Sequence, residues 1–118
     1  MTGSLEPGAI VLATDFALEP ADLAVDQIVA GSPRVREATL VERDGVEIGV
    51  WELSPGTVTD VEIDEVSVVI AGDATLEILD DAGGRTTHEL RPGTVFRLEA
   101  GMRTIWTVRE TLRKAYVV

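Results

Sequence analysis

The chain has 118 residues, a length that suits one domain with a single hydrophobic core. Its 21 acidic and 10 basic residues give a formal net charge of −11, which disfavours nucleic acid and anionic membranes as partners. There is no cysteine, so disulfides, thiolate zinc sites and cysteine nucleophiles are excluded. No segment has the pattern of a signal peptide or a membrane helix, and we expect a soluble cytoplasmic protein.

The first part of the chain predicts an extended arm followed by one short helix. Residues 20–30 begin with Pro20 and are followed by Gly31. Proline is typical of the first helical turn and glycine of the position just after a helix. We therefore expect residues 1–35 to form an arm with a short helix, in the same domain as residues 36–118.

From Ala38 onward, short apolar runs alternate with turn residues. Asp44-Gly45 and Pro55-Gly56 punctuate the first runs, and Arg91-Pro92-Gly93 and Gly101 punctuate later ones. A strand and a turn about every 8–12 residues indicates an all-β sandwich or barrel. We expect eight or nine antiparallel strands that close as a jelly roll or small barrel, whose interior either holds one small ligand or is filled by side chains.

The centre of the chain predicts two successive hairpins. Residues 66–70 and 75–79 are rich in branched side chains and flank Ala71-Gly72-Asp73. A Gly-Asp pair between two such runs indicates a tight turn, because glycine adopts a positive φ without strain. A second turn cluster, residues 80–84, is expected to lead into the strand at residues 85–90.

The end of the chain predicts two strands, residues 103–108 and 112–118, with a break at residues 109–111. Lys114 and Tyr116 alternate and therefore share one face of the last strand. On a face that lines a cavity they would bind a carboxylate or carbonyl group. On an outer face they would border a subunit interface, and we favour this second alternative.

The order of short motifs resembles the cupin superfamily. It is most similar to a small single-domain group that includes the (S)-ureidoglycine aminohydrolase cupin domain and the ethanolamine-utilisation cupin. The resemblance implies a jelly-roll cupin barrel with an internal ligand cavity, usually as a homodimer. The matching motifs lie between residues 25 and 118 and are Gly49-Val50-Trp51-Glu52, Pro55-Gly56, Asp64-Glu65, Val68-Val69-Ile70-Ala71-Gly72, Asp81, Gly83-Gly84, Leu90-Arg91-Pro92-Gly93, Gly101, Trp106-Thr107-Val108 and Arg113-Lys114-Ala115-Tyr116.

The same resemblance implies a metal site whose histidine ligands this chain lacks. Metal-binding cupins carry two histidines and a glutamate in the first motif and a third histidine in the second. The glutamate corresponds to Glu65, but no histidine precedes it, and Thr104 stands in place of the third histidine. We expect no bound transition metal. The alternative is an oxygen-ligated Mg²⁺, Ca²⁺ or Mn²⁺ held by Asp60, Glu62 and Glu65.

Candidate site residues lie in and around these motifs. Trp51 and Trp106, the only tryptophans, are expected to wall the cavity or to pack in the core. Glu62 and Glu65 are candidates for an acid–base pair, because burial beside an aromatic ring can raise the pKa of one carboxyl group. The alternative has Glu62 in solvent and Glu65 paired with an arginine. The other predicted pocket residues are Asp60, Arg97, Arg103 and Thr104.

In this pocket Arg97 or Arg103 would hold an anionic group of the ligand. His88, the only histidine, lies among polar residues and is expected on the surface rather than as a general base. Two functions stay open. One is an enzyme that acts on a small polar nitrogenous or carbonyl compound without a transition metal, with Glu62 and Glu65 exchanging protons. The other is a non-catalytic, dimeric ligand-binding or assembly module.

Overall fold

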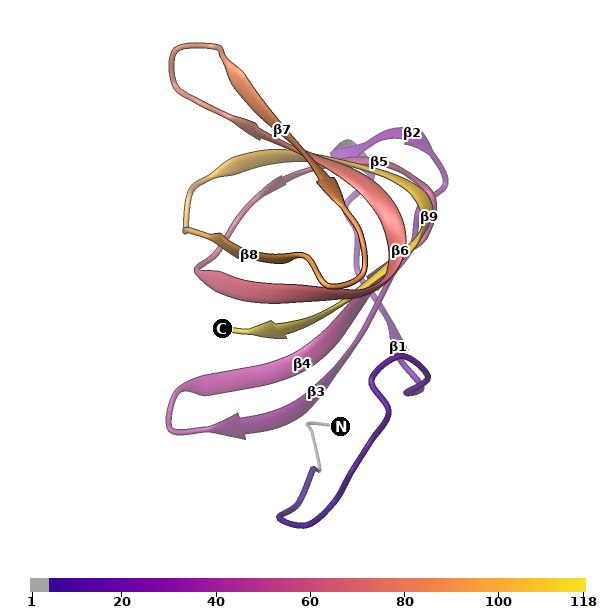
Figure 1. Cartoon of the computed structure of the whole chain (residues 1–118). Coiled ribbons are helices and arrows are strands. Elements are labelled where there is room, and N and C mark those ends of the chain that lie inside the picture. The colour runs from indigo at the N-terminus through magenta and orange to yellow at the C-terminus, as the bar shows by residue number, and fades with distance from the viewer. Residues whose placement is uncertain (1–4) are drawn as a thin grey trace.

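Nine strands form one antiparallel sheet that curls on itself in the computed structural model, which describes residues 5–118 (Figure 1). The sheet order is β1-β3-β4-β9-β5-β2, and β6 pairs with β7, β8 and β9. This architecture confirms the predicted all-β jelly-roll barrel. The strands are β1 Glu19–Ala21, β2 Ile28–Gly31, β3 Val35–Arg43, β4 Val46–Leu53, β5 Gly56–Val61, β6 Glu65–Leu79, β7 Arg85–Leu90, β8 Val95–Leu98 and β9 Arg103–Val117, with one 3₁₀ turn, η1, at Val25–Gln27.

Strand β9 is the centre of the fold, because it pairs with β5 along its first half, with β4 along its second half and with β6 along both. The prediction of two separate strands here is wrong. The expected break at residues 109–111 coincides with register shifts in the β6–β9 ladder, such as that between the Ala71–Arg113 and Asp73–Glu110 pairs. Both strands bulge at this level, so the ladder continues past the irregularity.

The predicted hairpin at Ala71-Gly72-Asp73 is also wrong, because β6 runs through these residues without turning. Gly72 has a φ of +101°, as a turn would require, but the reason is a close approach of β9. A Cβ atom there would overlap the carbonyl oxygen of Thr111 and lie 2.7 Å from the Cα of Leu112. Glycine thus marks a bulge between two bent strands.

Other predicted turns are confirmed. Asp44 and Gly45 have φ values of 53° and 80° and join β3 to β4, as expected for a two-residue hairpin turn with positive φ at both positions. The cluster at residues 80–84 joins β6 to β7. There Asp80 Oδ1 accepts hydrogen bonds from the backbone N–H groups of Ala82 and Gly84 at 2.9 and 2.8 Å.

The predicted helix at residues 20–30 is replaced by β1, η1 and β2. A chain this short gains little from helix formation alone, so tertiary contacts decide its conformation. Ile28 pairs with Val58 of β5, and Gln27 Nε2 donates to the Thr59 carbonyl oxygen at 3.0 Å. These contacts extend the chain along β5 after a single turn.

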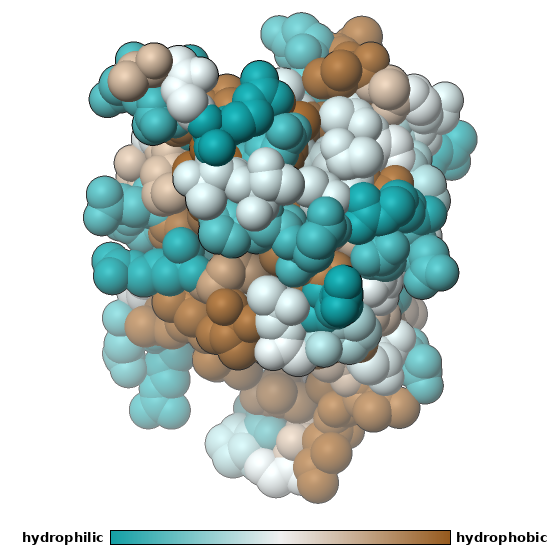
Figure 2. Space-filling view, turned by 45° about the horizontal axis from the view of Figure 1, so that its top comes forward, coloured by the Kyte–Doolittle hydropathy of each residue, from teal (hydrophilic) through white to brown (hydrophobic). Residues whose placement is uncertain are grey.

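The arm from residue 5 to residue 18 packs on the outer face of the sheet. Leu18, Leu40 and Val50 form a small core beneath it. Arg113 Nη1 fixes the arm by donating to the carbonyl oxygens of Ala13 and Phe16, both at 3.0 Å. Residues 1–4 of the predicted arm lie outside the described residues. Figure 2 shows hydrophobic residues at the surface mainly in the lower half of the view, below largely hydrophilic ones.

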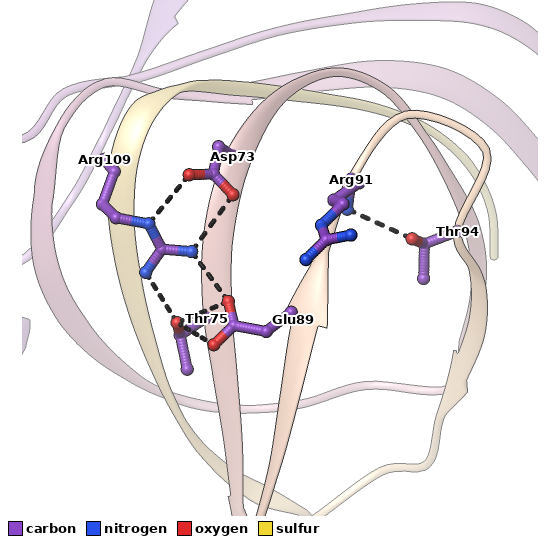
Figure 3. Close-up of polar contacts among 6 residues, drawn as sticks. All are labelled: Asp73, Thr75, Glu89, Arg91, Thr94 and Arg109. Carbon is purple, nitrogen blue, oxygen red and sulfur yellow. Dashed lines mark hydrogen bonds and ion pairs between the residues drawn. The ribbon is translucent and has the colours of Figure 1, made fainter.

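A polar cluster on the outside of the barrel bridges the bulged segments of β6 and β9 (Figure 3). Arg109 Nε and Nη2 donate to the two carboxylate oxygens of Asp73 at 2.9 and 3.1 Å. The same guanidinium donates to Glu89 Oε2 and to Thr75 Oγ1, both at 2.7 Å. Its hydrogen bonds hold the pKa of Asp73 below the usual value. The cluster ties β7 to the two central strands where their register shifts.

No helix within residues 5–118 has the length and apolar character needed to cross a membrane. The interior of the curl holds the main core, which includes Leu53, Leu76, Leu98 and Leu112, each no more than 1% exposed. These side chains fill only part of the interior. The remaining space is a cavity.

Candidate ligand cavity

The cavity has a volume of about 590 Å³ and is lined by residues from several strands and from the segment around η1. Both tryptophans of the chain contribute, with ring centroids 5.8 Å apart. The lining contains six acidic side chains and one lysine. The lining residues are Ala21, Asp22, Leu23, Gln27, Val35, Glu37, Glu47, Trp51, Val58, Asp60, Val61, Glu62, Ile63, Glu65, Trp106, Lys114, Tyr116 and Val118.

Lys114 points into the cavity and is almost entirely buried, with 4% of its surface exposed. Its Nζ donates to Glu65 Oε1 at 2.5 Å. It also lies 4.7 Å from the ring centroid of Trp51 and 5.1 Å from that of Trp106, within range of cation–π attraction. Strand register explains this position, because Lys114 pairs directly with Trp51 across β9 and β4.

The preferred sequence interpretation, in which Lys114 and Tyr116 border a subunit interface, is therefore wrong. Both residues line the cavity. The alternative in which Glu65 pairs with an arginine is also wrong, because its carboxylate pairs with Lys114. The even-numbered residues near the end of β9 face the cavity. Strand β9 is paired with β4 on one edge and with β6 on the other, so these residues lie in the middle of the sheet.

Glu62 is buried rather than in solvent, with 8% of its surface exposed. Its Oε2 accepts hydrogen bonds from Thr104 Oγ1 at 2.6 Å and from Trp106 Nε1 at 3.2 Å. Burial raises the pKa of Glu62, and the nearby charge of Asp60 raises it further. Burial also raises the pKa of Asp60, although this residue is the more exposed of the two.

Asp60 and Glu62 are therefore the carboxyl pair that the structure brings together, whereas the sequence suggested Glu62 and Glu65. Thr104, a predicted pocket residue, lies beneath Glu62 and fixes its orientation. Two neighbouring carboxyl groups whose pKa values are both raised are suited to exchanging a proton with a ligand.

The two predicted anion-binding arginines lie outside the cavity. Arg97 is exposed on β8, opposite Val66. Arg103 is exposed at the start of β9, and its Nη2 donates to the Asp80 carbonyl oxygen at 3.4 Å. No arginine among residues 5–118 lines the cavity. His88 is exposed on β7, which confirms its predicted surface position.

Sequence reasoning missed Glu47 in the lining and favoured an interface position for Tyr116, which lines the cavity. Tyr116 donates its hydroxyl hydrogen to Glu47 Oε2 at 2.6 Å, and burial raises the pKa of Tyr116, so the phenol stays protonated. Gly49 lies between Glu47 and Trp51 on the same face, and any Cβ there would overlap the Tyr116 hydroxyl. Strand alternation counted back from Trp51 would have placed Glu47 in the cavity.

A family model described as an EutQ-like cupin domain matches residues 40–116. The chain belongs to this family. The match confirms the resemblance to cupins and to the ethanolamine-utilisation cupin in particular. Among curated proteins, none matches the chain.

Solved structures share the cupin fold at low sequence identity. A protein of unknown function from Pseudomonas syringae pv. tomato superposes with a TM-score of 0.70 at 22% identity, over 87% of this chain and 44% of that one. The EutQ protein of Clostridium difficile gives 0.56 at 23%, over 73% and 62%. A cupin superfamily protein from Desulfitobacterium hafniense gives 0.57 at 16%, over 71% and 75%. At these identities the likeness shows the fold alone.

The cavity of this cupin does not fit the histidine-ligated metal centre that the superfamily implies. Its lining has no histidine. No group of three or more histidine, cysteine or acidic residues within residues 5–118 is arranged to hold an ion, so the alternative set of Asp60, Glu62 and Glu65 is not brought together. Glu65, the residue that matches the motif glutamate, is instead bound by the ammonium group of Lys114.

Replacing Glu62 with glutamine should weaken the pH dependence of stability in this cupin. A carboxyl group whose pKa is raised on folding stabilises the fold fully below its unfolded pKa of about 4.3, and this contribution is lost as the pH rises through the folded pKa. Glutamine keeps an oxygen that accepts from Thr104 and Trp106 but does not ionise. The urea midpoint of Glu62→Gln should fall less between about pH 5 and about pH 8 than that of the parent chain.

The control for this prediction is Glu110→Gln, since Glu110 is exposed on β9. That variant should keep the pH dependence of the parent. Equal slopes for Glu62→Gln and the parent would contradict the assignment of a raised pKa to Glu62.

Proposed function

We propose that this cupin binds a small polar molecule in its cavity and exchanges protons with it through Asp60 and Glu62, without a transition metal. The observation that carries the proposal is the convergence of two tryptophans and a carboxyl pair of raised pKa on one cavity of about 590 Å³. Ligand sites for small molecules typically have volumes of about 300–1,000 Å³ and combine aromatic walls with a few polar groups.

The chemistry that suits this arrangement is general acid–base catalysis on a nitrogenous or carbonyl compound. One member of a coupled carboxyl pair can hold a proton while the other is ionised, so the pair can donate at one atom and accept at another. A relation to the ureidoglycine aminohydrolases is part of this proposal and rests on the sequence resemblance. Glu65 does not exchange protons in this proposal, because its carboxylate is held in an ion pair with Lys114.

Tryptophan emission offers a direct test, since the only two tryptophans both line the cavity. The parent chain and Glu62→Gln would be screened against small amides, ureides and carbonyl compounds, with product formation followed by proton NMR. We expect at least one compound to change the emission and to be converted by the parent, with conversion lost in Glu62→Gln. Binding without conversion would identify a non-catalytic module. No change of emission with any compound would overturn the proposal.

The assembly role is favoured by one observation, a row of exposed apolar residues across the outer face of the sheet. Ile48, Val117 and Val66 are direct register neighbours on β4, β9 and β6, and each is between 37% and 44% exposed. Val95 on the adjacent β8 is 68% exposed. We propose that a second copy of this chain covers the row, because the row contains no acidic residue and borders Arg97, so two strongly acidic chains can meet there with least repulsion.

Light scattering coupled to gel filtration tests this pairing. The parent chain should elute as a dimer, and Val66→Asp should elute as a monomer, because it would bury a charge at the contact. Val29→Asp, on β2 outside the row, should remain a dimer. A monomeric parent chain would contradict the proposed homodimer.

A further inference from the structure

The charge of the cavity restricts the class of ligand that can enter. Its lining contains six carboxylates and one ammonium group. That ammonium group, on Lys114, is 4% exposed and already bound by Glu65, so it does not attract an anion from solution. Electrostatic interactions are stronger in such a partly desolvated space than in water. A cationic ligand is favoured there and an anionic one is repelled.

Glu62 supplies an acceptor that no protein group uses. Its Oε2 accepts both of its hydrogen bonds, from Thr104 and Trp106, and no donor among residues 5–118 pairs with Oε1. The side chain is more than nine-tenths buried and lines the cavity. Within residues 5–118 the only fully buried side-chain oxygen or nitrogen without a partner is Ser67 Oγ, so Glu62 Oε1 remains accessible and can accept a hydrogen bond from a ligand N–H group. Asp60, in β5 and two residues before Glu62, presents a second carboxyl group to the same space.

The aromatic wall suits an organic cation as well. Trp51 and Trp106 already stabilise one ammonium group, that of Lys114, at 4.7 and 5.1 Å. Trp51 is only partly buried, so part of its ring remains open to a ligand. Indole rings attract alkylammonium groups through their quadrupole and pack against methylene chains.

We infer that the ligand of the cavity is a small organic amine, bound as a cation with its ammonium group at Asp60 and Glu62 and its carbon chain against Trp51. The inference rests on the proposed function and names its ligand class. A bare metal ion is disfavoured, because no three acidic residues within residues 5–118 are arranged around one point. An anion is disfavoured because the two predicted arginines lie outside the cavity.

Three probes with the same four-carbon chain test the inference by changing only the charge: 1,4-diaminobutane, 1,4-butanediol and succinate. Titrations would follow tryptophan emission at an ionic strength of about 0.15 M, where attraction to the acidic surface is largely screened. We expect the diamine to bind at least about tenfold more tightly than the diol, with no binding of succinate. Glu62→Gln and Asp60→Asn should each weaken diamine binding about tenfold or more.

Asp81→Asn is the matched control, because Asp81 is an exposed carboxylate in the β6–β7 turn outside the cavity lining. Its diamine affinity should equal that of the parent chain, and a matching loss would show non-specific charge attraction and overturn the inference. Tighter binding of the diol or succinate, or binding of MgCl₂ in place of the diamine, would overturn the inference while leaving a ligand-binding cavity. No emission change with any of the three probes would overturn the inference alone, because the proposed function is tested by the separate screen of amides, ureides and carbonyl compounds.

Discussion

Gly72→Ala should lower the free energy of unfolding by about 3–5 kcal/mol, a loss large enough to threaten folding of a domain this size. Two costs combine. The residue has a φ of +101°, which residues other than glycine adopt only under strain. The new methyl group would also overlap the backbone of β9 at Thr111 and Leu112, and the backbone of a central strand has little room to move. Urea unfolding followed by circular dichroism measures the loss.

Gly83→Ala separates the two costs. Gly83 has a similar φ of +85°, but no atom lies within 4 Å of the position its Cβ would take. It should therefore show the conformational cost alone, about 1 kcal/mol. If both variants lose the same stability, the close approach of β6 and β9 at Gly72 contributes nothing, and the bulge is more adaptable than the structure indicates.

Residue types that determine local conformation made much of the fold predictable. Asp44-Gly45 and the cluster at residues 80–84 form the predicted turns because their backbone conformations are set within a few residues. Gly72 has the same local signature but a different cause, since the constraint comes from β9, about forty residues later in the chain. No local pattern distinguishes a glycine that turns the chain from one that admits a neighbouring strand.

Part of the cavity lining was predictable from the residues in and beside the sequence motifs. Trp51, Trp106, Asp60 and Glu62 line the cavity as the motifs suggested. The faces of Arg97 and Arg103 depended on strand register, and a shift of one residue reverses which side chains point inward. Lys114 was assigned to the wrong side for the same reason. The pairing of β9 with β4 and β6 determines which way the Lys114 side chain points. That pairing cannot be predicted from the sequence of a single strand.

Lys114 connects the stability of the barrel to the character of its cavity. Its ammonium group donates a hydrogen bond to the Glu65 carboxylate inside the cavity and neutralises its charge. Asp60 and Glu62 form no ion pair with this ammonium group within residues 5–118, although its nearby charge lowers the pKa of both carboxyl groups against the larger effect of burial. The ion pair of Lys114 and Glu65 thus links β9 to β6 inside the lining, and Asp60 and Glu62 are the lining carboxyl groups that the proposed ligand engages.

Lys114→Met should lower the free energy of unfolding at neutral pH by about 3–5 kcal/mol, because it leaves the Glu65 carboxylate buried without its partner. Methionine matches the length of the lysine stem and keeps the contacts with Trp51 and Trp106, so the lost charge is the main change. Stability should recover in part on acidification, since the lone carboxylate can then take up a proton. Urea unfolding at neutral and acidic pH measures both effects.

The double variant Lys114→Met/Glu65→Gln tests whether the loss comes from the unpaired charge. It removes both ionised groups and should regain most of the stability that the single variant loses, because replacing both partners of a buried pair costs far less than removing one. Its unfolding free energy should also vary less with pH than that of Lys114→Met. If the double variant is as unstable as the single one, Lys114 acts through packing on the tryptophans, and the ion pair with Glu65 is not what holds β6 to β9.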